Sequence, residues 1–115
     1  MTFGPKPNAG RTMPEGPNYR LTKRADADVL EIAKYTIARF GVEQSRRYRD
    51  DLAETFAALS KNPQLGRAAE HLAPGLRRWE HESHVIFYMS LADGVLVVRV
   101  LHRNMDVQRH SMADS

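Results

Sequence analysis

The sequence has no cysteine, no long hydrophobic run and no apolar stretch near its start. The absence of cysteine excludes disulfide bonds and thiolate metal sites, and it is compatible with a reducing compartment. The longest apolar run is far shorter than the roughly 20 residues that a membrane-spanning helix needs. Residues 1–18 also lack the apolar segment of a secretory signal. We therefore expect a cytoplasmic protein.

The sequence also lacks a strong excess of positive or negative charge. The formal net charge is +3 and the pI is near 9.5, but the surplus comes from scattered arginines rather than from a Lys/Arg run. No basic tail indicates nucleic-acid binding, and the charge favours acidic partners only mildly. A chain of 115 residues with 42% hydrophobic side chains fits one domain with its own core.

Residues 1–18 are rich in the residues that disfavour regular structure. They hold four of the six prolines and three of the seven glycines. Such a segment buries too little surface to offset the entropy of ordering it. We expect a flexible leader over 1–18, with Met13 as an alternative start.

Two amphipathic helices are predicted next, after a short β-compatible segment at Tyr19–Leu21. Thr22 is a suitable N-cap, and Gly41 stands where a helix would stop. A second helix is predicted from Glu43 to Lys61, before Asn62-Pro63. The apolar stripes recur every three or four residues: Ala25, Val29, Ile32, Thr36 and Phe40, then Tyr48, Leu52, Phe56 and Leu59. We read both stripes as core and the pair as an antiparallel helical hairpin.

The hydrophobic period then changes to that of strands. Gln64–Pro74 is predicted to be a connector, followed by strands at Leu76–Glu82, His84–Leu91 and Val95–His102. Asp93-Gly94 marks a hairpin turn between the last two. The apolar, β-branched run of the third strand is typical of a strand that is central or covered on both faces. The predicted fold is α+β in the order β-α-α-β-β-β, with the helical hairpin packed on a small antiparallel sheet that Val95–His102 closes.

Several short motifs follow one another in a recognisable order over Tyr19 to Asp106. They are Tyr19-Arg-Leu-Thr22, Ala25, Asp28-Val29, Ile32, Tyr35-Thr36, Phe40-Gly41, Asn62-Pro63, Leu65-Gly66-Arg67, Pro74-Gly75-Leu76-Arg77, Ile86-Phe87-Tyr88, Val98-Arg99-Val100-Leu101-His102 and Met105-Asp106. Together they resemble ParE-type toxins of the RelE/ParE toxin–antitoxin superfamily. On this resemblance, residues 19–103 form the toxin domain and residues 104–115 a C-terminal tail.

The resemblance implies a plasmid or chromosomal toxin without a reaction of its own. A ParE-type toxin is expected to trap the DNA-cleavage complex of DNA gyrase and block replication. A ParD-like antitoxin would neutralise it by folding onto the helices and sheet, and DNA would be bound only indirectly, through the antitoxin complex. No cofactor is implied. The expected gyrase contact is the far edge of the sheet with the tail Arg103–Ser115.

The RelE branch of the same superfamily offers the alternative of a ribosome-dependent mRNA endonuclease. That reaction needs a base, an acid and cations around the scissile phosphate. The candidates are Arg77, Arg78, Glu80, Arg99, His102 and Arg103, but no Tyr or Lys follows His102. This departure favours the inhibitor and predicts no catalytic residue. An inactive relative that only binds antitoxin is a further alternative.

Individual residues keep two interpretations. His102 is either a general acid/base or, as we favour, a structural histidine that fixes the C-terminal turn through the backbone or Asp106. Arg99 is either paired inside the domain or available to an acidic antitoxin segment. His81 and His84 lack a third ligand at recognisable spacing, so no metal site is predicted. The predicted partner-binding residues are Arg77, Arg78, Arg99, His102, Arg103, Met105 and Asp106.

Overall fold

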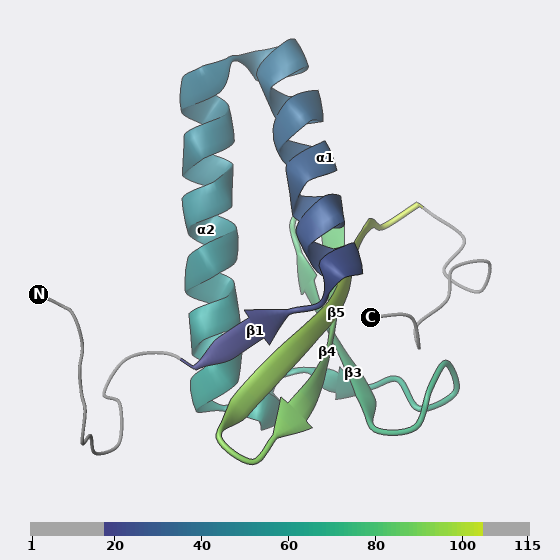
Figure 1. The fold of residues 1–115 in the computed structure, drawn as a ribbon. Coiled ribbons are helices and arrows are strands. Elements are labelled where there is room, and N and C mark those ends of the chain that lie inside the picture. The colour runs from purple at the N-terminus through teal and green to yellow at the C-terminus, as the bar shows by residue number, and fades with distance from the viewer. Residues whose placement is uncertain (1–17, 105–115) are drawn as a thin grey trace, which may run out of the picture.

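A computed structural model describes residues 18–104, which form two helices on one side of a twisted sheet (Figure 1). Neither helix is long and apolar enough to cross a membrane. The predicted α+β class and element order are confirmed, with a 3-10 turn and one short strand added. In chain order the elements are β1 (Tyr19–Leu21), α1 (Lys23–Phe40), α2 (Val42–Lys61), η1 (Pro63–Leu65), β2 (Arg67–Ala68), β3 (Leu76–His81), β4 (His84–Leu91) and β5 (Gly94–His102).

Local chemistry sets the ends of α1. Thr22 caps the helix by accepting the backbone N–H of Ala25 at 3.0 Å, which satisfies one of the free donors of the first turn. Gly41 ends α1 with φ at 95° and donates its N–H to the carbonyl of Ile37. Few residues other than glycine adopt this angle without strain. Because α2 starts at the very next residue, the two helices form the predicted antiparallel hairpin.

Phe40 differs from its prediction as a core residue. Ala25, Val29 and Ile32 pack in the core between helices and sheet, and Thr36 is buried, whereas Phe40 is 64% exposed. Figure 1 shows the reason: the tip of the hairpin reaches beyond the sheet, so the last turn of α1 has no sheet beneath it. Helical periodicity continues along the whole of α1, but the surface that could bury the last turn does not.

The sheet is mixed rather than purely antiparallel. Its strand order is β1-β5-β4-β3-β2, and β1 runs parallel to β5 while the other neighbours are antiparallel. β5 is therefore a central strand, as its apolar run predicted, and does not close the sheet at an edge. β2, a two-residue edge strand, lies inside the segment predicted to be a connector.

Both faces of the sheet are covered, which explains the almost continuous hydrophobicity of β5. On one face, sheet residues pack with the helices; on the other, they pack with residues 69–73, which return over the sheet before β3. The helix-side cluster contains Ala25, Leu52, Phe56, Leu59, Ile86, Tyr88, Val95, Val97 and Val100. The opposite cluster contains Ala69, Leu76, Val85, Phe87, Val98 and Leu101.

A β-bulge in β5 decides which face the end of the strand presents. Phe87 pairs with Arg99 and Tyr88 with Val97, which leaves Val98 as the extra residue. An extra residue reverses the alternation of side chains beyond it. Val97 and Val100 therefore both belong to the helix-side cluster. The same reversal brings His102 to the helix side, next to His84.

A candidate partner-binding groove

A hollow of about 750 Å³ lies between α1, the start of α2, the β3–β4 turn and the end of β5. We call it the α1 groove. Its walls combine apolar side chains with eight polar or charged ones, and two of its aromatic side chains, Tyr35 and Phe40, are 59% and 64% exposed. Its lining residues are Asp28, Glu31, Ile32, Tyr35, Thr36, Phe40, Gln44, Tyr48, Glu82, Ser83, His84, Val100, Leu101 and His102.

The base of the groove is braced by an ion pair between α1 and β5. Arg99 donates from Nε and Nη2 to the carboxylate of Asp28, at 2.8 and 3.0 Å. The same carboxylate accepts the backbone N–H of Val100 at 2.9 Å. The Arg99 side chain is only 7% exposed, so the structure matches the interpretation in which this arginine is paired inside the domain. Its availability to an antitoxin stays a prediction.

Tyr48 and His84 form the polar side of the groove. Burial raises the pKa of Tyr48 to about 12, with smaller contributions from Glu82 and Asp51. Burial lowers the pKa of His84 to about 4, and the nearby His102 and His81 add to the shift. At neutral pH the phenol therefore keeps its proton and His84 is neutral. The Tyr48 hydroxyl shares a 2.7 Å hydrogen bond with Nδ1 of His84 and donates to the carbonyl of His81 at 3.4 Å. The pair closes one end of the groove without introducing a charge.

His102 lies against His84, with ring centroids 5.6 Å apart. Its Nδ1 accepts the backbone N–H of Asn104 at 3.2 Å, which is the backbone contact that the structural interpretation predicted. Arg103 donates to the carbonyl of Glu82 at 3.3 Å. His102 and Arg103 are thus brought together beside the groove, at the end of β5.

The remaining predicted arginines are dispersed. Arg77 faces the helix side of β3 and donates to the carbonyl of Gly66 at 2.5 Å. Arg78 lies on the opposite face, 3.1 Å from Glu80 and over the ring of Phe87 at 5.8 Å. This separation matches the predicted alternation along β3. Met105 and Asp106 lie outside the described residues.

The groove itself was missed by sequence reasoning. The helical stripes predict core positions for Tyr48 and Phe40, and Tyr35 enters only as part of a family motif. The α1 stripe gives no signal for the groove, because periodicity does not tell how far the sheet beneath a helix extends. Within residues 18–104, no three His, Asp or Glu side chains gather as a metal site would require.

Comparison with known proteins agrees with the fold and the motifs. A profile of the ParE toxin of type II toxin–antitoxin systems (parDE) matches residues 19–107. The chain is 39% identical over 92 residues to Toxin ParE1 of Caulobacter vibrioides, covering 80% of this chain and 95% of that one. It is also 39% identical over 93 residues to Toxin ParE1 of Mycobacterium tuberculosis, covering 80% and 95%.

A more distant relative and a solved structure extend the comparison. Toxin ParE of Escherichia coli is 36% identical over 90 residues, covering 77% of this chain and 87% of that protein. A structure titled as a chromosomal ParDE TA system from P. aeruginosa shares the fold, with a TM-score of 0.64 at 18% identity, covering 75% of this chain and 95% of that one. The chain belongs to the ParE toxin family of type II toxin–antitoxin systems.

Proposed function

We propose that this ParE toxin inhibits DNA gyrase by trapping its DNA-cleavage complex, and that a ParD-like antitoxin neutralises it. The observation that carries the antitoxin half is the α1 groove, whose exposed Tyr35 and Phe40 stand on a hairpin that reaches beyond its own sheet. An antitoxin segment that folds on binding would bury these rings in the way that amphipathic helices fill apolar grooves.

The dispersal of the predicted cations supports inhibition rather than RNA cleavage. A phosphoryl-transfer site places its acid, base and cations within reach of one phosphate. Arg77 and Arg78 occupy opposite faces of β3, and Arg99 is held in the interior by Asp28. His102 and Arg103 alone remain together, beside the groove. These two residues and the edge at β2 and β3 are the proposed gyrase contacts.

A supercoiling assay tests the gyrase half. Purified gyrase acts on relaxed plasmid with and without the toxin, and the cleavage complex is trapped with detergent and protease. We expect less supercoiled product and more linear DNA. A His102→Ala variant should inhibit within about twofold of the unaltered toxin, because an exposed contact residue contributes little by itself. Normal supercoiling, together with codon-positioned mRNA cuts in a translating extract, would establish the RelE-type reaction instead.

Antitoxin binding is tested by calorimetry with a ParD-like antitoxin. Phe40→Ser and Tyr35→Ser should each weaken binding at least tenfold, since buried aromatic side chains dominate protein interfaces. Leu30→Ser is the matched control: Leu30 is 56% exposed on the same helix but does not line the α1 groove. Unchanged binding by the Phe40 and Tyr35 variants would place the antitoxin elsewhere, and an equal loss for Leu30→Ser would show that the loss is not specific to the groove. Unimpaired antitoxin binding by a chain inactive on both gyrase and ribosomes would identify an inactive relative.

A further inference from the structure

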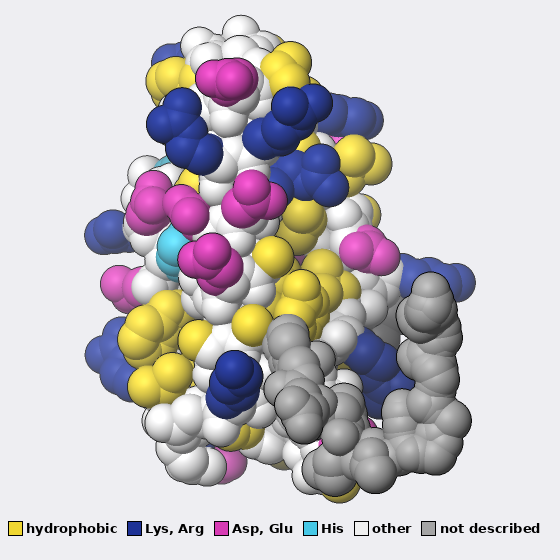
Figure 2. All heavy atoms as spheres, turned by 90° about the vertical axis from the view of Figure 1, so that its left-hand side faces the viewer, with side chains coloured by type: hydrophobic (Ala, Val, Ile, Leu, Met, Phe, Trp, Pro, Cys, Tyr) yellow, Lys and Arg dark blue, Asp and Glu magenta, His cyan; other side chains and the backbone are white. Residues whose placement is uncertain are grey.

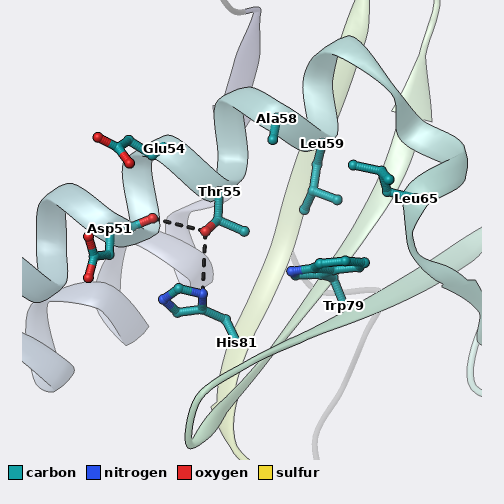
Figure 3. Close-up of a pocket in the computed structure, with 8 residues that line it drawn as sticks. All are labelled: Asp51, Glu54, Thr55, Ala58, Leu59, Leu65, Trp79 and His81. Carbon is teal, nitrogen blue, oxygen red and sulfur yellow. Dashed lines mark hydrogen bonds between the residues drawn. The ribbon is translucent and has the colours of Figure 1, made fainter.

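A second, smaller hollow of about 300 Å³ lies between α2 and β3. Figure 3 shows its construction: Trp79 reaches up from β3, Leu59 and Leu65 lie above the indole, and polar side chains occupy the opposite end. Trp79 is half-buried, and Leu65 is 43% exposed. We call it the Trp79 pocket. It is lined by Asp51, Glu54, Thr55, Ala58, Leu59, Leu65, Trp79 and His81.

The rim of the pocket is acidic although the chain as a whole is basic. Asp51 and Glu54 are exposed, stand one helical turn apart on α2, and make no ion pair with any residue between 18 and 104. Figure 2 looks onto this side of the molecule, where acidic side chains gather with a histidine among them and hydrophobic side chains lie below. A cation placed here would meet two carboxylates that are not already engaged in an ion pair within residues 18–104.

The histidine of the pocket adds an acceptor. The hydroxyl of Thr55 donates its proton to the carbonyl of Asp51, at 2.9 Å. Its 3.4 Å contact with Nδ1 of His81 therefore requires the histidine to be the donor, which leaves Nε2 of the neutral ring as an acceptor. That nitrogen is buried without a hydrogen-bond partner in the described part of the chain, and the exposed carboxylate of Glu82 lies 4.0 Å from it. Figure 3 shows it turned toward the end of the pocket where Asp51 lies.

We propose that the Trp79 pocket receives an arginine side chain from a partner protein. The guanidinium would donate to the carboxylates of Asp51 and Glu54 at the polar end of the pocket, and the side chain would pass over the indole of Trp79. Arginine fits better than lysine because its planar, donor-only head pairs with carboxylates in a fork. The apolar part of its stem would lie against Leu65. An anionic ligand is disfavoured by both carboxylates.

The pocket carries its own reporter, because Trp79 is the single tryptophan of the chain. Intrinsic fluorescence of the full-length toxin is titrated with N-acetyl-arginine amide, and in parallel with the neutral isostere N-acetyl-citrulline amide. We expect a saturable change with the arginine probe, at a Kd on the order of 10 mM, and none with citrulline. The N-acetyl-lysine amide should bind more weakly than the arginine probe.

Two variants assign the response to the acidic rim. Asp51→Asn combined with Glu54→Gln should weaken arginine binding at least fivefold, whereas Asp50→Asn, on α2 but outside the pocket, should leave it unchanged. Unaltered starting fluorescence and circular dichroism confirm that each variant is folded. An equal response to citrulline, an equal affinity for lysine, no saturable response, or the same loss in all variants would each overturn the assignment. Because neither gyrase nor antitoxin is present, the result is independent of the function proposed above.

Discussion

Asp28 and Arg99 lie 71 residues apart in the chain and form a two-pronged ion pair with N···O distances of 2.8 and 3.0 Å. The pair ties the first half of α1 to the central strand just past the bulge at Val98. β1 pairs with β5 only as far as Val97. Beyond it, Thr22 donates its hydroxyl to the carbonyl of Val98 and Asp28 accepts the N–H of Val100. Hydrogen bonds from the side chains of Thr22 and Asp28 thus continue along this edge of β5 after the pairing with β1 ends.

Removing the carboxylate should therefore destabilise the domain strongly. We expect Asp28→Ala to lower the free energy of unfolding by about 3 kcal/mol, because it breaks a buried ion pair and leaves a backbone donor unsatisfied. Urea denaturation followed by circular dichroism measures the change. Glu31→Ala is the control, since its pair with Lys34 is 74% and 65% exposed and contributes little. Equal losses in the two variants would contradict this account of Asp28.

The hydroxyl of Tyr88 joins the sheet to the turn that follows α2. It accepts the N–H of Gly66 at 2.8 Å and donates to the carbonyl of Pro63 at 2.7 Å, and the residue is fully buried. Tyr88→Phe should cost about 2 kcal/mol of unfolding free energy, because two buried backbone groups lose their partner. Tyr35→Phe, at a residue 59% exposed, should be neutral in the same denaturation experiment. A neutral Tyr88→Phe would show that these groups find other partners.

Gly94 should tolerate no side chain. A Cβ there would collide with the carbonyl oxygen of Asn18, which accepts the N–H of Val95 where β1 meets β5. We expect Gly94→Ala to cost about 2–3 kcal/mol through overpacking and to reduce hydrogen-exchange protection at the start of β5. Gly41→Ala separates the causes, because Gly41 has φ at 95° but open space around it and should lose only about 1 kcal/mol to backbone strain. A smaller loss for Gly94→Ala than for Gly41→Ala would be inconsistent with the collision.

The lowered pKa of His84 predicts that the domain loses stability in mild acid. The unfolded chain takes up this proton near the ordinary value of 6.5, whereas the folded protein does so only near 4. Stability from this group is therefore complete above about pH 6.5 and falls as the pH drops toward 4. The loss should be about 1–2 kcal/mol, discounted for the partial exposure of the ring. Denaturation at a series of pH values measures it.

His84→Asn provides the matched control for that pH dependence. Its side-chain amide can still hydrogen-bond the hydroxyl of Tyr48, and it does not titrate. The variant should lose less stability between pH 6.5 and 4 than the unaltered protein. An identical slope in the two proteins would show that His84 is not the group responsible.

Periodicity predicted the elements where local chemistry decides them. Thr22, Gly41 and Asn62-Pro63 bound the helices as expected, and the last two strands begin and end within a residue of their predicted ends. Pattern reading failed at Phe40, because a helical stripe carries no information about how far the sheet beneath it extends. It also gave no sign of β2, whose two residues are too few to show alternation.

In the candidate site too, some side chains are placed by local pattern and others only by packing. The alternation of side chains along a strand suffices to place Arg77 and Arg78 on opposite faces of β3. Arg99, by contrast, has two open interpretations on sequence grounds, since its partner Asp28 is distant in the chain and meets it only because α1 packs beside β5. The apposition of His102 with His84 depends on a one-residue bulge, and the sequence of β5 contains no glycine or turn residue at Val98 to mark it.

By itself, the sequence determined the α+β class, the helical hairpin, the burial of β5 and, through ordered motifs, the ParE family. The first three properties follow from short-range periodicity, capping residues and turn residues, which act within a few positions of one another. The family follows from the resemblance of the motifs to those of known toxins. Only the tertiary structure decided the parallel pairing of β1 with β5, the Asp28–Arg99 pair, the α1 groove and the Trp79 pocket. Each of these brings together side chains or strands that are remote in the chain, and their distances depend on how helices and sheet pack rather than on local preference.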